Sequence, residues 1–226
     1  MGAPKKIMVP ELLDFLPADD PRAIRSRRDL VRINAVMGQS RIMAKALAQF
    51  PQPRLLVDLG GGDGSFLLAV ARRMKWRDVR AVILDRQAIV GPDTRQAFKA
   101  LGWTCEVVQG DIFDTLPRLS PDIVAANLFL HHLEDAALQG LLGLVAARAR
   151  GFVACEPCRA SLPLLGARLL FALGANDVTR HDAVASVRAG FSAGELSRHW
   201  PAGGWRLQER GVFPFTHLFV AARDAV

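Results

Sequence analysis

The chain has few cysteines, no tyrosine and no long apolar run. Three cysteines in 226 residues cannot build a disulfide framework, and reduced thiols favour a cytoplasmic protein. No stretch reaches the roughly eighteen consecutive apolar residues of a membrane span, and the basic start at residues 1–6 lacks the apolar run of a secretory signal. Half of the residues are hydrophobic and 23% are charged, which is typical of a globular protein with one substantial core. No membrane association is expected.

The charge is basic and gathers near the N-terminus. The formal net charge is +7, and residues 1–50 hold nine Lys or Arg against five Asp or Glu, which places +4 there. A basic lobe can bind nucleic acid or an anionic substrate, or can only keep the protein soluble. Arginine exceeds lysine along the whole chain, which favours a solvated surface. The charge alone therefore predicts no partner.

Two prolines, at positions 51 and 53, separate two differently patterned regions. Before them, apolar residues recur near helical spacing from Ile24 to Met37, and Ser40 is expected to cap a second helix. Residues 1–50 are thus predicted to form a small helical lid, and residues 51–226 one α/β domain. Short apolar runs alternate there with helical stretches. The expected strands are 54–59, 79–84, 105–109, 123–126 and 151–155, and the expected helices are 65–73, 94–101, 134–149 and 162–173.

The strand-like runs are continuously apolar, which predicts parallel strands that are buried on both faces. Two further runs, 205–210 and 215–222, are joined by only a few residues and must pair antiparallel. We therefore expect an α/β fold with a Rossmann-like, seven-stranded, mostly parallel sheet. A C-terminal antiparallel hairpin closes this sheet, and the small helical appendage precedes it.

A glycine-rich segment follows the first expected strand. Four of the five residues from position 60 to 64 are glycine, and a helix is expected directly afterwards. Glycine lets the backbone turn sharply and approach a ligand closely, and a helix start offers free N–H groups. Ligands of open α/β sheets bind beyond the carboxyl ends of the strands. The segment therefore predicts a ligand site, because a plain turn needs fewer glycines.

The glycine spacing also indicates which ligand the segment holds. A dinucleotide fingerprint would place its third glycine at position 65, which is Ser65, so an NAD-dependent oxidoreductase is the weaker alternative. Asp58, Gly60, Gly62 and Gly64 instead match Asp-x-Gly-x-Gly-x-Gly. This pattern resembles the first motif of class I S-adenosylmethionine-dependent methyltransferases, and the resemblance extends over nearly everything from position 55 to 155.

Segments after the fourth and fifth strands narrow the resemblance. Residues 127–133, Asn-Leu-Phe-Leu-His-His-Leu, and the pair Glu156-Pro157 resemble the small-molecule methyltransferases of quinone and polyketide tailoring. The likeness weakens past Cys158, where the substrate pockets of such enzymes diverge. A shared fold does not fix the substrate.

The resemblance implies a role for several residues of the cofactor site. The glycines would line the methionine end of S-adenosylmethionine, and Asp58 would support its ammonium group. Asp85 would accept hydrogen bonds from both ribose hydroxyls, and Asp111 from the adenine amino group. Each acid alone could instead cap a turn. The expected cofactor-binding residues are Asp58, Gly60, Gly61, Gly62, Gly64, Asp85, Arg86, Asp111, Ile112, Phe113 and Asn127.

Three histidines are candidates for a catalytic base, which is needed if the acceptor must lose a proton. His131 and His132 follow the fourth strand beside the expected cofactor, and His131 is preferred because it is nearer to Asn127. Either one could instead bond the backbone. His181 is a secondary candidate in the polar segment 176–182, although such a segment is usually a solvent-facing loop.

The two cysteines at 155 and 158 have the spacing of a redox or metal pair. Zinc needs about four ligands and no second pair exists, so we expect no metal site and assign Cys155 to a buried strand. A proline inside the pair also argues against a redox function.

The expected acceptor pocket is apolar with a thin polar lining, which suits a small phenolic or enolic metabolite. Its residues are expected among Ile33, Met37, Met43, Leu169, Leu170, Phe171 and Phe191, with Arg180 and His181. We expect O-methylation of this acceptor, with residues 1–50 as a lid and a homodimer allowed. The alternative is a methyltransferase of RNA or another nucleic acid that uses the basic lobe, although no base-flipping Asn-Pro-Pro-Tyr-type tetrapeptide follows the fourth strand.

Overall fold

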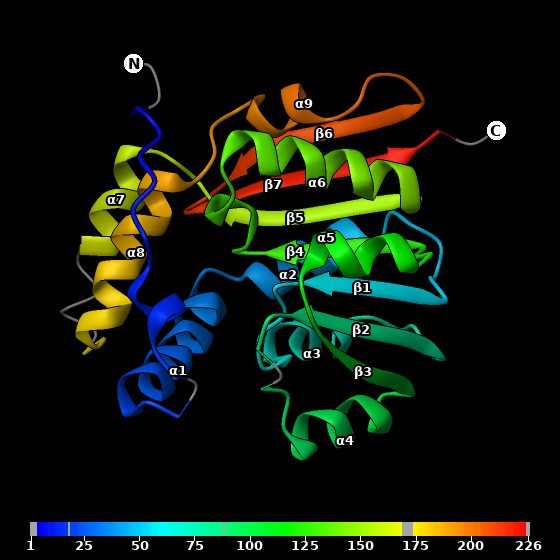
Figure 1. Cartoon of the computed structure of the whole chain (residues 1–226), viewed down its shortest axis with the longest axis horizontal. Coiled ribbons are helices and arrows are strands. Elements are labelled where there is room, and N and C mark those ends of the chain that lie inside the picture. The colour runs from blue at the N-terminus through cyan, green and yellow to red at the C-terminus, as the bar shows by residue number, and fades with distance from the viewer. Residues whose placement is uncertain (1–3, 18, 88, 169–173, 225–226) are drawn as a thin grey trace.

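Seven strands form one sheet in a computed structural model that describes residues 4–17, 19–87, 89–168 and 174–224 (Figure 1). The strand order is β3-β2-β1-β4-β5-β7-β6. The strands are β1 (Leu55–Leu59), β2 (Val79–Asp85), β3 (Trp103–Gln109), β4 (Ile123–Asn127), β5 (Gly151–Pro157), β6 (Trp205–Val212) and β7 (Thr216–Arg223). The first five strands are parallel, and β7 is antiparallel to both β5 and β6. The predicted sheet and its C-terminal hairpin are confirmed.

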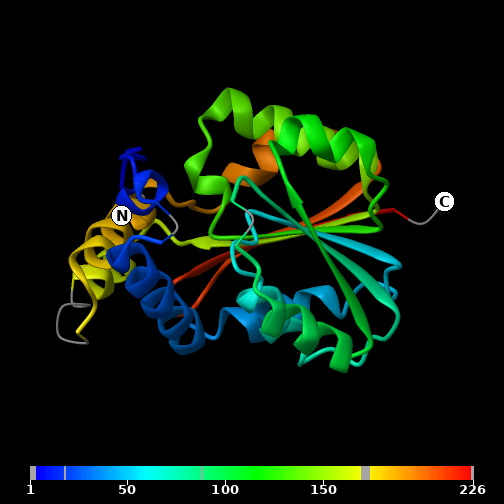
Figure 2. The same cartoon turned by 60° about the horizontal axis from the view of Figure 1, so that its bottom comes forward.

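Helices cover both faces of this sheet (Figure 2). One layer consists of α2 (Gln39–Leu47), α3 (Ser65–Ala71) and α4 (Pro92–Ala100), and the other of α5 (Ile112–Thr115), α6 (Asp135–Arg148) and α9 (Glu195–His199). Alternate residues of the strands point to opposite faces, so that Val57 packs in one core and Leu56 in the other. This two-sided burial explains why the strands read as continuous apolar runs.

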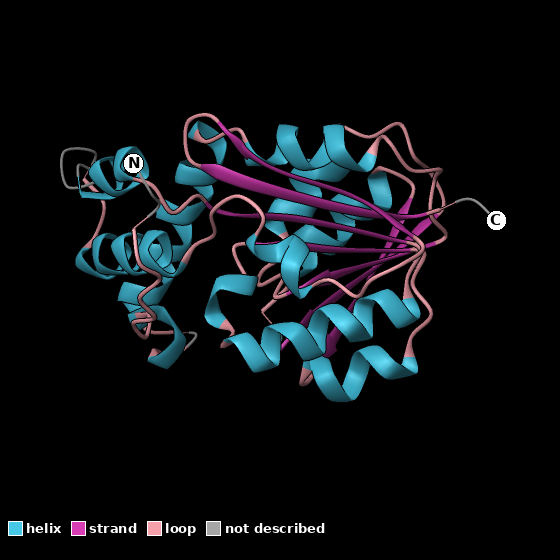
Figure 3. Ribbon diagram, turned by 90° about the horizontal axis from the view of Figure 1, so that it is seen from above, coloured by secondary structure: helices cyan, strands magenta, loops and turns pink. Residues whose placement is uncertain are grey.

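A third group of helices lies at the carboxyl ends of the parallel strands, at the left of Figure 3. It comprises η1 (Leu12–Phe15), α1 (Pro21–Val36), α7 (Ser161–Arg168) and α8 (Asp177–Ala189), and the short η3 (Leu130–His132) lies between α8 and β5. The short η2 (Leu116–Arg118) instead packs with α5 and α6 in the second layer. We call residues 4–16 the strap, because they run along α8 (Figure 1). The Ile7 amide bonds the Arg188 carbonyl, and the amides of Leu12 and Leu13 both bond the buried Asp182 carboxylate. The strap is thereby fixed beside the end of the sheet.

Two local predictions are wrong. The second helix begins at Gln39 after Gly38, whose φ is +64°, and Ser40 does not cap it; the Ser40 hydroxyl instead accepts from Arg73. The polar segment 176–182 is not a loop, because the Asn176 side chain accepts from the Thr179 amide and starts α8 there.

The N-terminal fifty residues pack in two different places. Met43 and Leu47 of α2 are fully buried in the core of the sheet, whereas η1 and α1 lie over the end of the strands. The predicted domain division at residue 50 stays a prediction. Within the described part of the chain, no helix is long and apolar enough to cross a membrane.

Candidate cofactor and acceptor site

A cavity of about 650 Å³ opens where the strand order reverses, between the ends of β1 and β4. Nine of the eleven expected cofactor residues line it, and Gly64 and Asp111 are the two that do not. The opposite wall comes from η1 and α1. The cavity therefore joins the predicted cofactor loop to the N-terminal helices.

The glycine loop has a backbone that only glycine adopts without strain. Gly60, Gly62 and Gly64 all have positive φ, at +65°, +57° and +74°. A Cβ on Gly60 would lie 2.3 Å from the Phe129 ring, whereas a Cβ on Gly62 would meet nothing within 4 Å. Gly60 is thus required by packing. Gly62 leaves open space on the side of the cavity.

Asp58, at the end of β1, is buried and incompletely bonded. Its Oδ2 has no hydrogen-bond partner among the described residues, and the same is true of Asn127 Oδ1 on the neighbouring β4. Burial, and then the nearby charge of Asp85, raise the pKa of Asp58 to about 8. An unpartnered buried acceptor is costly without a ligand. The ammonium group of the expected cofactor would satisfy both oxygens.

Asp85, at the end of β2, already organises the loop. Its Oδ2 accepts from the Gly62 amide at 2.9 Å, and its Oδ1 accepts from the Gln87 amide at 2.8 Å. Each carboxylate oxygen can accept a second hydrogen bond, so a pair of ribose hydroxyls can be held without breaking these contacts.

Asp111 caps α5 by accepting from the Phe113 amide, and its other oxygen pairs with Arg86 at 2.7 Å. The Arg86 contact, followed by the Phe113 amide, holds the pKa of Asp111 below its usual range. Asp111 itself is outside the cavity lining, although Ile112 and Phe113 belong to it. Its adenine contact stays a prediction. An adenine amino group would have to share the Asp111 carboxylate with Arg86 or take the place of Arg86.

The wall opposite the glycine loop is mainly apolar, but its residues differ from those expected. The structure places Leu13, Phe15, Leu30 and Val31 there, with Asn34 and Arg27 as polar neighbours. Ile33 and Met37 are not among the lining residues, and Met43 and Phe191 are buried in the core. The helix α1 forms as predicted, but the face that it turns to the cavity carries Leu30 and Val31, and not the expected Ile33 and Met37. Leu169, Leu170 and Phe171 lie outside the described residues.

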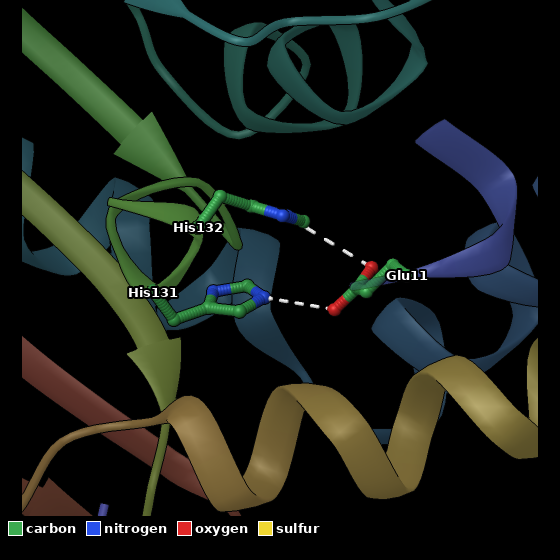
Figure 4. A group of neighbouring side chains, drawn as sticks. All are labelled: Glu11, His131 and His132. Carbon is green, nitrogen blue, oxygen red and sulfur yellow. Dashed lines mark hydrogen bonds and ion pairs between the residues drawn. The ribbon is translucent and has the colours of Figure 1, made fainter. Parts of the chain in front are cut away.

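The adjacent histidines occupy different positions at the rim of the cavity. His132 lines the cavity, whereas His131 is 2% exposed and lies behind it. The His131 Nδ1 donates to Glu156 at 2.7 Å, because that carboxylate also accepts from three backbone amides, those of residues 129–131, and must be the acceptor. The His131 Nε2 lies 3.2 Å from Glu11 of the strap (Figure 4).

Glu11 and Glu156 were not predicted as partners of a histidine. Burial disfavours the imidazolium form of His131, but the hydrogen bonds that His131 donates to Glu11 and Glu156, and the charges of these carboxylates, outweigh it and raise the pKa of His131 to about 9. Glu156 was recognised only through the Glu-Pro pair that resembles the family. Glu11 stands 120 positions from His131 in a segment without periodicity, so no pattern in the sequence could have joined them.

His181 lies apart from this cluster. It is on α8, its side chain is 43% exposed, and it pairs with Asp182 outside the cavity lining. Arg180 likewise points to Asp177 on its own helix. Cys155 is fully buried in β5, as expected.

The residues present fit S-adenosylmethionine. Two unpartnered buried oxygens could accept hydrogen bonds from its ammonium group, the carboxylate at the end of β2 could accept from its ribose, and the space beside Gly62 is open. These features come from three neighbouring strand ends, at the point of the sheet where open α/β folds bind their ligands.

The comparisons with known proteins agree with this site. A family model described as "O-methyltransferase domain" matches residues 18–154. An O-methyltransferase family protein from Burkholderia thailandensis is similar in structure, with a TM-score of 0.63 and 19% identity over 92% of this chain and 61% of that one. The pyocyanin biosynthetic protein PhzM has a TM-score of 0.62 and 24% identity over 91% of this chain and 60% of PhzM. This chain thus spans about three fifths of both.

A third structure matches over nearly its whole length. The plantazolicin methyltransferase BamL, solved with a triazolic desmethylPZN analogue and SAH, has a TM-score of 0.64 and 10% identity over 93% of this chain and 92% of BamL. The predicted fold is confirmed, and the family match supports the predicted enzyme class and S-adenosylmethionine cofactor. The chain belongs to the O-methyltransferase domain family.

Proposed function

We propose that this chain methylates the hydroxyl group of a small, largely apolar metabolite of phenolic or enolic type. The observation that carries the proposal is that one cavity has the cofactor residues on one wall and Leu13, Phe15, Leu30 and Val31 on the other. A cavity of about 650 Å³ has the size and the mainly apolar character of a small-molecule site. PhzM is a pyocyanin biosynthetic protein and BamL is a plantazolicin methyltransferase, and an acceptor of natural-product type for this chain is in keeping with both.

The chain's own residues bind and orient both reactants. S-adenosylmethionine supplies a methyl group on a positively charged sulfur. Asp58 and Asn127 hold its ammonium group, and Asp85 holds its ribose. The apolar side chains of η1 and α1 hold the acceptor against the cofactor and exclude water. This positioning is the main requirement of an in-line methyl transfer.

The acceptor's proton leaves at the histidine cluster. His132 reaches the cavity directly, and His131 lies behind it in an orientation that Glu156 fixes. His181, which lies outside the cavity lining, takes no part. The predicted cytoplasmic location and homodimer rest on the sequence and stay predictions.

The test is a turnover assay with S-adenosylmethionine and a panel of phenols and enols, read by S-adenosylhomocysteine release and by the mass of the methylated product. Leu30→Gln should lower turnover at least several-fold and leave cofactor affinity within about twofold, because Leu30 lines only the acceptor side. Ile33→Gln, on the same helix but outside the lining, is the matched control. Methyl transfer to RNA, with none to the panel, would contradict the proposal.

A further inference from the structure

We propose that Asn34 of α1 is a specificity-determining residue. It selects acceptors that carry a second hydrogen-bond donor, such as a further hydroxyl group, besides the hydroxyl that is methylated. Asn34 lines the cavity, and its Oδ1 is buried without a hydrogen-bond partner among the described residues. A buried carbonyl oxygen without a donor is costly, and a donor on a bound ligand would satisfy it. The inference rests on the proposed function, because it concerns the acceptor of the same cavity.

One face of α1 forms a large part of the acceptor wall. Arg27, Leu30, Val31 and Asn34 have the i, i+3, i+4, i+7 spacing of a single helical face, and all four line the cavity. The Arg27 end of this row reaches the segment after β2, where the Arg27 Nη2 lies 3.4 Å from the Gln87 Oε1. Seven residues span about 10.5 Å along a helix. The Asn34 amide therefore lies at the other end of the row, beyond the two apolar side chains.

The opposite face of α1 is fixed to α8. The Asp29 carboxylate accepts from the Asn176 amide at 3.0 Å, and the hydroxyls of Ser26 and Thr179 form a hydrogen bond of 3.0 Å. Asp29, Ser26 and Thr179 are all buried. A binding group on a rigid support loses less freedom when the ligand arrives. The helix thus presents its cavity-facing row, with Asn34, in a fixed position.

The remaining polar side chains of the acceptor wall already have partners. The Asp14 carboxylate lies 3.4 Å from the His132 Nδ1, and Arg27 contacts Gln87. The ammonium group and the ribose of the cofactor are assigned to the strand ends on the other wall. The Asn34 oxygen is thereby left for the acceptor. Since the reacting hydroxyl gives up its proton at His132, the group at Asn34 is a second one, and it keeps its proton.

The test is the binding of 1-naphthol and of a set of dihydroxynaphthalenes to protein saturated with S-adenosylhomocysteine, measured by calorimetry. These compounds share one apolar ring system, and the dihydroxy isomers place a second donor at different positions. We expect the tightest dihydroxynaphthalene to bind the unaltered protein about tenfold or more tightly than 1-naphthol, because it satisfies the buried oxygen. Asn34→Leu should reduce this preference to less than about twofold. Val36→Leu is the matched control and should retain the preference, because Val36 is 79% exposed on the same helix and outside the cavity lining.

The affinity of the same samples for S-adenosylhomocysteine alone should be unchanged in Asn34→Leu, which shows that the variant is folded and that the residue serves the acceptor. An undiminished preference in Asn34→Leu, or no preference for any dihydroxynaphthalene in the unaltered protein, refutes the inference. If 1-naphthol is methylated in that case, the proposed function still stands. If the dihydroxy compounds bind in a manner that depends on Asn34 but accept no methyl group from S-adenosylmethionine, the proposed function fails and the binding role of Asn34 stands.

Discussion

Binding of the cofactor should release a proton from Asp58. The carboxyl group is buried with one unpartnered oxygen, and its pKa of about 8 means that it is about nine-tenths protonated at pH 7. A cationic ammonium group beside it favours the carboxylate, so the proton must leave on binding. We therefore expect about 0.9 protons released per cofactor at pH 7 and about 0.1 at pH 9.

The same pKa sets how affinity depends on pH. Ionising a group with a pKa of about 8 costs about 2.7 kcal/mol at pH 6 and about 1.4 kcal/mol at pH 7. Cofactor affinity should therefore rise about tenfold between these two pH values. Above the pKa the carboxylate is already present, and this contribution levels off.

Calorimetry in buffers of different ionisation enthalpy measures the released proton directly. The observed binding enthalpy, plotted against buffer ionisation enthalpy, should have a slope corresponding to about 0.9 protons at pH 7. Asp58→Asn should abolish this slope and weaken binding. Asp63→Asn is the matched control, since Asp63 also lines the cavity but uses its carboxylate to accept from the Ser65 amide. A slope of zero in the unaltered protein at pH 7 would refute the placement of the ammonium group at Asp58.

Four further changes probe the site and its support. Asp85→Ala should weaken S-adenosylhomocysteine binding by more than about tenfold in calorimetry, because each lost charge-assisted bond is worth roughly 1.5–3 kcal/mol; unchanged affinity would exclude its ribose contact. Gly60→Ala should lower the melting temperature more than Gly62→Ala, whose Cβ meets open space, and equal losses would contradict the packing argument. Burial opposes ionisation of Glu209, but hydrogen bonds from a histidine and a serine hold its pKa at about 2. The carboxylate therefore stabilises the fold above about pH 4.5, and this contribution is lost as the pH falls towards 2. Glu209→Gln should flatten that part of the pH-dependence of the free energy of urea unfolding, and an unaltered profile would refute this. Cys155→Ala should retain methyl transfer, and loss of activity with normal folding would show that the cysteine does more than fill the core.

The sheet and the cofactor loop could be predicted because local rules determine them. Continuous apolar runs bounded by turns indicate buried parallel strands. Backbone positions with positive φ require glycine, so the loop can be recognised from the glycine spacing in the sequence alone. Asp58 and Asp85 could be predicted as site residues for the same reason, since each stands at the end of a strand that the apolar pattern marks.

The acceptor side and the histidine cluster could not be predicted in this way. The face that α1 turns to the cavity depends on its packing against α8, which is far away in the sequence, so Ile33 was expected where Leu30 lies. The contact of Glu11 with His131 is set by the path of the strap, and the bonds that hold the strap come from Asp182 and Arg188 on α8. Neither segment carries a local signal of its partner.

The most direct test of the central claim is a crystal structure with S-adenosylhomocysteine bound. We expect its ribose at Asp85 and its amino group at Asp58, with an enclosed apolar space left between its sulfur and the side chains of Leu13 and Leu30. Binding elsewhere, or a wide and basic surface facing the sulfur in place of that space, would contradict the account of a cavity shared by the cofactor and a small acceptor.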